Sequence, residues 1–429
     1  MVRISLPAKT HGRSLPILLV SSWMWHLTRW GGLFLGAYLI THLGGRPIAN
    51  QLVGVAMFAP MLLGSYFAGK VDMDPRRLVL FTEIVLLPIS VLMTVLVGTG
   101  AVMPWMVYPF ELAYGFGGMV NMTAQRELLF RIGGPQRATR VLNTELAGLA
   151  SAQMLGPLIG GLTIAFFGLG AAFGVLAVLL ACSAPLLWVS TRHLPAQARV
   201  IAPDDARRVG AKPDWQLLFR SRVLAVILLA TLICNLCYFA FIPLVPVIAE
   251  NLEAGPAMTG IIGSTAGIVQ VVVAAAIVIR PARYPFAAYT FGVGLCMVCL
   301  AALAYAPTVP VALLTLGVAG IGQALFGATQ ATLPLSTVAD HERATALGLV
   351  TTTIGLALPT GMVILGVTSN LLGARPAMLL SALVGLAAIA VTVLANQKLL
   401  RTPQRETPSG HATCVGGECN SIAAQPELG

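Results

Sequence analysis

Twelve apolar runs, each long enough to cross a lipid bilayer, constrain the fold of this chain more than any other feature. The most polar stretch between them, residues 191–222, has six runs on either side. A helix needs about 20 apolar residues to span a hydrocarbon core of ~30 Å. Only 10% of the residues are charged, whereas soluble domains carry about 25%. We therefore predict an all-α, polytopic membrane protein with 12 transmembrane helices in two six-helix halves.

The predicted spans divide the chain into similar halves. We expect helices over residues 17–43, 50–69, 78–98, 104–124, 142–167, 170–190, 223–249, 256–279, 285–306, 309–336, 345–370 and 376–396. The expected domains are a cytoplasmic tail (1–16), a six-helix half (17–190), a cytoplasmic loop (191–222), a second six-helix half (223–396) and a polar, disordered tail (397–429). Pro243 and Pro246 predict a kink in the seventh span.

Positive charge is concentrated in alternate loops. Of the 26 Lys and Arg residues, all but Arg29, Arg46 and Arg375 fall in the tails and loops of one side. Because basic loops stay in the cytoplasm, we expect both termini to be cytoplasmic. We expect the protein itself to lie in the plasma membrane of a bacterium, its inner membrane. The net charge of +10 then reports topology and contact with membrane lipid, and we expect no nucleic-acid partner.

The two halves also share short sequences. Arg137-Ala138-Thr139 precedes the fifth span and Arg343-Ala344-Thr345 precedes the eleventh. Parallel repeats joined by a cytoplasmic loop predict a pseudo-twofold axis along the membrane normal, with a substrate site at the interface between the halves.

The loop after the second span reads GSYFAGKVDMDPRRL. It resembles the loop motif of the major facilitator superfamily, a glycine followed by D-R-x-G-R-R. The matching positions are Gly64, Asp72, Arg76 and Arg77, and the departures are Ala68, Met73 and Pro75. The resemblance implies a conformational switch in which these charges latch the loop to helix ends. The alternative is an ordinary charged loop without a latch.

The fifth span contains Ala152-x-x-x-Gly156-Pro157-x-x-Gly160-Gly161. This is similar to the superfamily's antiporter motif, G-x-x-x-G-P-x-x-G-G, which accompanies exporters. Small residues allow helices to approach closely and the proline bends the helix, so we assign this motif to the conformational switch. The arrangement most resembles the enterobactin-exporter type. The alternative is general helix packing.

Ionisable residues inside spans are candidates for function. Arg29 lies about 18 Å along the first span and Glu111 about 19–20 Å from the cytoplasmic end of the fourth, at 1.5 Å per residue. In this superfamily both helices line the central cavity, so the resemblance implies a mid-membrane pair. Its carboxylate would carry the proton, and a substrate, particularly a cation, would compete for it. The alternative is a structural ion pair.

Glu111 also departs from the family pattern. The sequence Glu111-x-x-Tyr114-Gly115-x-Gly117-Gly118 stands where exporters often have R-x-x-Q-G-x-G, so the charge is reversed. Other candidates for substrate or proton coupling are His26, Tyr114, Asn235, Tyr238 and Gln323. We expect Glu83, near the start of its span, to reach the surface or to pair with a loop arginine.

Cysteine is the remaining signal. The pairs Cys234/Cys237 and Cys296/Cys299 are expected to pack as small apolar residues in separate helices. No metal site is expected, and the only weak candidates are His411, Cys414 and Cys419 in the tail.

Together these features predict a transporter, not an enzyme, with no cofactor. We expect a monomeric secondary transporter that exports a small amphipathic molecule, drug-like or siderophore-like, by alternating access in exchange for protons. The alternatives are a transporter-like receptor or metal sensor using the tail thiols, and a lipid or lysolipid flippase.

Overall fold

In the computed structural model, the structure describes residues 11–63, 73–134, 137–194, 217, 220–280, 282–330, 332–338 and 342–400. These residues are overwhelmingly helical and contain no strand. Nine of the described helices are long and apolar enough to cross a membrane. Three further segments complete the predicted twelve spans: α1 (His11–His42) and α5 (Val107–Gly133), which are more polar, and α2 (Pro47–Phe58), which is shorter.

The first half has six spans. They are α1 (His11–His42), α2 (Pro47–Phe58) with a 3₁₀ turn (Ala59–Leu63), α4 (Pro75–Gly98), α5 (Val107–Gly133) after a 3₁₀ turn (Pro104–Met106), α6 (Ala138–Phe167) and α7 (Leu169–Thr191). α5 continues well beyond its predicted end at residue 124. Arg126, assigned to a loop from the sequence, is therefore part of the helix.

The second half repeats this arrangement. Its first span consists of α10 (Arg222–Ile233), a π-helical turn (Cys234–Tyr238), a 3₁₀ turn (Phe239–Leu244) and α11 (Val245–Asn251). The others are α12 (Pro256–Ile279), α13 (Pro285–Ala304), α14 (Val309–Gln330) with the short α15 (Leu333–Ser336), α16 (Arg343–Leu372) and α17 (Ala374–Ala395), followed by α18 (Gln397–Leu400).

The break between α10 and α11 begins earlier than its prolines suggest. Pro243 lacks an N–H and its ring crowds the carbonyl of residue 239, so regular hydrogen bonding fails one turn before it. The π-helical turn extends the irregular stretch back to Cys234. Cys234 lies next to Cys296 of α13, so the two cysteine pairs, which are buried in separate helices as expected, are neighbours.

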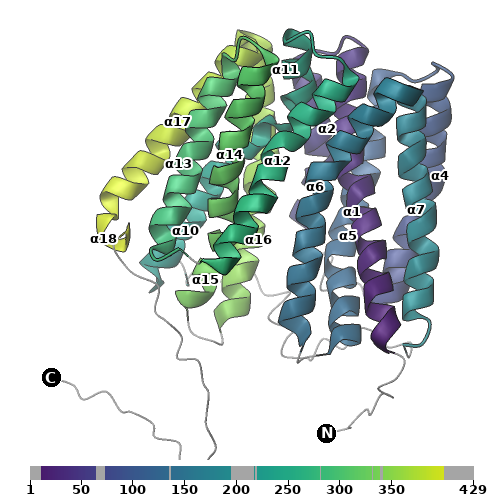
Figure 1. The fold of residues 1–429 in the computed structure, drawn as a ribbon, viewed down its shortest axis with the longest axis horizontal. Coiled ribbons are helices and arrows are strands. Elements are labelled where there is room, and N and C mark those ends of the chain that lie inside the picture. The colour runs from purple at the N-terminus through teal and green to yellow at the C-terminus, as the bar shows by residue number, and fades with distance from the viewer. Residues whose placement is uncertain are drawn as a thin grey trace, which may run out of the picture.

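The two halves lean against each other at one face of the molecule (Figure 1). α1 begins, and α17 and α18 end, at the opposite face. We call the face at which α1 begins the terminal face, and the face at which the two halves meet the distal face. In Figure 1 the halves, α1 to α7 in purple to blue and α10 to α17 in teal to yellow, converge at the distal face and diverge toward the terminal face.

The contact at the distal face depends on glycines, which let two helices approach closely, and on backbone carbonyls that accept hydrogen bonds. α6 meets α12 where a Cβ built on Gly161 would stand 2.6 Å from Gly260 Cα. Beside it, Asn50 Nδ2 donates to the Pro243 carbonyl at 3.3 Å and Gln51 Nε2 donates to the Ala240 carbonyl at 3.0 Å. These carbonyls are free to accept because the helix between α10 and α11 is broken. The irregular span thus joins the halves.

Candidate substrate-binding site

A cavity of about 440 Å³ lies between the two halves. This is within the range of about 300–1,000 Å³ for small-molecule sites. Its walls come from α1, α2, α5 and α6 on one side and from the broken span, α12, α14 and α16 on the other. It therefore lies where the internal repeat predicts a substrate site.

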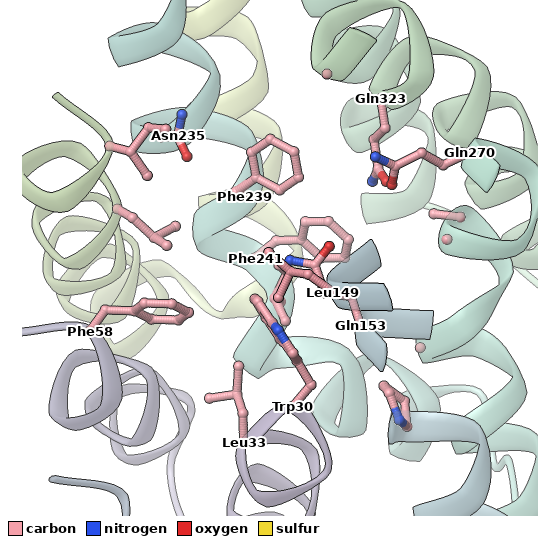
Figure 2. Close-up of a pocket in the computed structure, with 18 of the residues that line it drawn as sticks. Trp30, Leu33, Phe58, Leu149, Gln153, Asn235, Phe239, Phe241, Gln270 and Gln323 are labelled. Atoms are coloured by element: carbon pink, nitrogen blue, oxygen red, sulfur yellow. The ribbon is translucent and has the colours of Figure 1, made fainter. Parts of the chain in front are cut away.

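The wall combines aromatic rings with amides (Figure 2). The aromatic side chains are Trp30, Phe34, Phe58, Phe239, Phe241 and Phe326. The amide side chains are Gln153, Asn235, Gln270, Gln323 and Gln330. Among the described lining residues the charged ones are Arg29 and Arg126, and none is acidic. A wall of this kind suits an apolar or aromatic molecule with a polar or negatively charged group.

Arg29 is buried in the cavity wall, with 3% of its surface exposed. Its Cζ lies 5.6 Å from the centre of the Phe58 ring, and its Nη2 lies 3.8 Å from Met61 Sδ. Among the residues that the structure describes, its Nε has no hydrogen-bond partner, and neither has Nε1 of Trp30, the next residue of α1. Two N–H donors on α1 are thus left without acceptors beside the cavity.

Glu111 is completely buried beside α1 rather than in the cavity wall. Neither carboxylate oxygen has a hydrogen-bond partner in the described part of the chain. A Cβ built on Gly36 would stand 2.8 Å from Glu111 Oε1, so this glycine makes room for the carboxylate. Glu111 and Arg29 interact electrostatically, but no ion pair within 4.0 Å joins them in the described structure. The predicted pair is close in space without direct contact.

The glycines after Glu111 pack α5 against three neighbours. A Cβ at Gly115 would stand 2.5 Å from the Met57 carbonyl oxygen of α2, and one at Gly117 would stand 2.8 Å from Leu86 Cδ1 of α4. At Gly118 it would stand 2.7 Å from Arg29 Nε. The last glycine therefore creates the space that the guanidinium occupies.

His26 belongs to a charged cluster nearer the terminal face. Its Nε2 lies 3.4 Å from Glu145 Oε1, and Arg126 Nε lies 3.6 Å from Glu145 Oε2. His26 and Glu145 are buried and do not line the cavity, whereas the Arg126 side chain is 40% exposed and does. Sequence reasoning missed Arg126 because the end of α5 was placed too early.

The remaining candidates separate into two groups. Asn235 and Gln323 line the cavity, and Gln323 Nε2 donates to Tyr238 Oη at 2.8 Å. Tyr238 itself does not line the cavity, but its hydroxyl holds the Gln323 amide in place. Tyr114 lies outside the cavity wall, where its hydroxyl is 2.7 Å from Ser90 Oγ and its ring stacks on Trp25.

Glu83 corrects another expectation. It is 1% exposed and accepts a hydrogen bond of 2.9 Å from Ser183 Oγ of α7. It neither reaches the surface nor pairs with a described arginine, because α4 turns it toward the interior of the first half.

The antiporter-like residues of α6 lie at helix contacts. A Cβ at Gly156 would stand 2.8 Å from the Gly31 backbone nitrogen, and one at Gly160 would stand 2.9 Å from Phe34 Cδ1. Gly161 faces α12, and Pro157 lines the cavity. The motif thus packs α6 against α1 on one side and against the second half on the other.

Part of the loop motif lies outside the described residues, including Gly64 and Asp72. Arg76 Nη1 donates to the Thr191 carbonyl at 3.3 Å, at the end of α7, and Arg77 is exposed. The latch stays a prediction. The tail candidates His411, Cys414 and Cys419 also lie outside the described residues, which themselves contain no cluster of metal-binding side chains.

Comparison with solved structures shows the fold. A POT family transporter in complex with a thioalcohol-conjugated peptide has a TM-score of 0.70 at 11% identity, over 90% of this chain and 96% of that one. The nucleoside transporter NupG has a TM-score of 0.64 at 15% identity, over 91% of this chain and 100% of that one. For a bacterial homologue of the human lysosomal transporter Spinster, inward-facing and unoccupied, the corresponding values are 0.66, 13%, 93% and 100%.

Sequence comparison gives the family. The curated protein sequences contain no match to this chain. The profile of the Major Facilitator Superfamily matches residues 18–338 and 227–418, which together cover most of its length. The chain is therefore a multi-pass transporter of the major facilitator superfamily.

Proposed function

We propose that this protein is a proton-coupled secondary transporter that exports a small amphipathic molecule by alternating access. The observation that carries the proposal is the cavity between the halves, closed at the distal face by the contact of α6 with α12. The charge distribution of the loops favours a cytoplasmic terminal face in a bacterial inner membrane. The cavity then receives its substrate from the cytoplasm.

Glu111 is the proposed proton carrier. Arg29 is charged throughout and cannot carry the proton itself. The proton affinity of a buried carboxylate depends on its distance from a nearby guanidinium. α1 and α5 carry these two groups without an ion pair between them, so a small displacement of one helix changes their interaction. Proton uptake and release can therefore follow the conformational cycle.

Export rests on the antiporter-like sequence of α6 and on its resemblance to the enterobactin-exporter type. The residues concerned, Gly156 to Gly161, lie where α6 meets both α1 and α12. A switch in access requires the contact with α12 to separate while that with α1 persists. We propose a monomer, because each chain contains both halves of the cavity.

The test compares Glu111→Gln with wild type in proteoliposomes that contain a trapped pH indicator. We expect the variant to bind aromatic solutes and to exchange them passively, but to move no protons with them. Glu83→Gln is the matched control, because it also removes a buried carboxyl from a span but lies away from the cavity. Wild-type proton movement in Glu111→Gln would remove Glu111 from the mechanism.

A further inference from the structure

We propose that the transported molecule is an organic anion with an aromatic or apolar body, and that Arg29 binds its anionic group. This inference names the substrate class of the proposed transporter and rests on that function. It also reverses the sequence expectation that a cation competes for Glu111.

The charge of the cavity wall is the first observation. The charged residues among the described lining residues are Arg29 and Arg126, and no lining residue is acidic. Glu111 is fully buried behind the wall and Glu145 is bound to Arg126 and His26, so neither carboxylate faces the cavity. A cationic solute would therefore meet two guanidinium groups without an accessible counter-ion.

The environment of Arg29 is the second observation. A buried guanidinium is costly unless an anion or several acceptors compensate it. Here the described contacts are the Phe58 ring and the Met61 sulfur, Glu111 acts on the guanidinium only through space without an ion pair, and Nε has no acceptor among the described residues. Trp30 Nε1, on the next residue of α1, also lacks an acceptor among the described residues. A carboxylate, sulfonate or phosphate oxygen has the acceptor capacity that these donors lack.

The rest of the wall defines the body of the molecule. The rings of Trp30, Phe58, Phe239 and Phe241 line the cavity (Figure 2), and the Phe58 ring lies against the Arg29 guanidinium. The volume of about 440 Å³ limits the substrate to a small molecule. An aromatic ring carrying one acidic group satisfies both the donors and the apolar surface.

Arg126 has a different part. Gly118, which contacts Arg29, and Arg126 are eight residues apart on α5, or about 12 Å along the helix axis. Arg126 is thus placed more than two helical turns nearer the terminal face. Because Arg126 is partly exposed and lies toward the terminal face, it raises the positive potential along the path to Arg29.

The inference has a consequence for energetics. Export of one monoanion in exchange for one entering proton moves two elementary charges across the membrane. An inside-negative potential therefore drives the exchange proposed above, whereas cotransport of a proton with a monoanion is electroneutral.

The binding test uses the purified full chain and three probes of one shape: 1-naphthoate, neutral 1-naphthamide and cationic 1-naphthylmethylammonium. Unfolding is followed with a thiol-reactive dye, because Cys234, Cys237, Cys296 and Cys299 are buried in the folded protein. We expect 1-naphthoate to stabilise the wild type most. Its affinity should fall about tenfold or more in Arg29→Gln, in which a charge-assisted hydrogen bond is lost. Arg29→Lys should retain part of it.

The control is the neutral amide, whose weak binding should be unchanged in Arg29→Gln if the cavity is intact. If Arg29→Gln does not fold, the preference of the wild type among the three probes decides the matter. Equal or stronger stabilisation by the ammonium probe, stabilisation by none of the three, or undiminished naphthoate binding by folded Arg29→Gln would each overturn the proposal.

A flux measurement separates this inference from the proposed function. Proteoliposomes loaded with 1-naphthoate are given a proton gradient, with the membrane potential set by potassium and valinomycin. We expect efflux to increase with inside-negative potential. Anion binding at Arg29 with potential-independent flux would support the substrate class and refute proton exchange. Proton-driven flux of the ammonium probe would support proton exchange and refute the anionic substrate class.

Discussion

Adding one methyl group at Gly161 should open the distal face. A Cβ at this position would stand 2.6 Å from both Gly260 Cα and the Pro256 carbonyl oxygen. The atoms that it meets belong to the backbone of α12, so no side-chain rotation can relieve the contact. α6 and α12 must separate, and the state in which they touch becomes less stable.

The size of the effect follows from overpacking. Inserting a methyl group into a close contact costs about 1–3 kcal/mol. If the state open at the distal face lacks this contact, its population relative to the closed state rises roughly 5- to 150-fold. The fraction able to bind from the terminal face falls, and the apparent affinity from that side falls in proportion.

The measurement is the distance between spin labels at Phe167 and Asn251, which are exposed at the distal ends of α6 and α11. We expect a longer-distance population in Gly161→Ala. Gly148→Ala on the same helix is the control, because its Cβ would meet only Trp23 Cδ1 at 3.7 Å. An unchanged distance distribution in a less stable Gly161→Ala protein would show that the contact persists throughout the cycle.

Two further predictions concern the binding site and the tail. Gly118→Ala should displace the Arg29 guanidinium, whose Nε and Cζ would lie 2.7 and 2.8 Å from the new Cβ, so naphthoate affinity should fall several-fold with little change in unfolding temperature. Gly348→Ala, with nothing near its Cβ, should leave both unchanged. Truncation after Leu400 removes a polar tail without the apolar content needed to fold. We expect normal flux; loss of flux in a normally expressed protein would favour the metal-sensing alternative.

The spans could be predicted because hydrophobic length reports directly on membrane crossing. The end of α5 could not, since residues 125–133 mix charged and apolar residues and continue a helix past the apolar run. Hydropathy measures where a helix leaves the hydrocarbon, not where its hydrogen bonding stops. This one difference hid Arg126 from the sequence reading.

That Arg29 and Glu111 lie near each other could also be predicted, because the rise per residue is fixed. Which way each side chain faces could not, because the packing of neighbouring helices sets the rotation of each helix. Arg29 faces the cavity, whereas Glu111 and Tyr114 face the helices of their own half. For this reason the substrate charge that we propose is opposite to the one expected from the sequence.

The cluster at Glu145 gives the last prediction. In Glu145→Gln, Arg126 loses the carboxylate that lies 3.6 Å from its Nε. The net charge beside the cavity then increases by about one unit, so the electrostatic potential in the cavity becomes more positive. The rise of about 12 Å along α5 between Gly118, which lies against Arg29, and Arg126 sets the scale of this interaction.

Two unit charges at that separation interact by about 0.3 kcal/mol in water and about 1.4 kcal/mol at an effective dielectric constant of ~20. Naphthoate affinity should therefore rise roughly two- to tenfold at low ionic strength. Because the Debye length is about 8 Å at physiological salt, the gain should shrink as salt is added. Glu127→Gln, which neutralises a neighbouring acid of α5 outside the cavity wall, is the control for a general change in charge. A salt-independent loss of naphthoate binding in Glu145→Gln would instead mean that Glu145 maintains the shape of the site through its contacts with His26 and Arg126, and that steering by Arg126 contributes nothing.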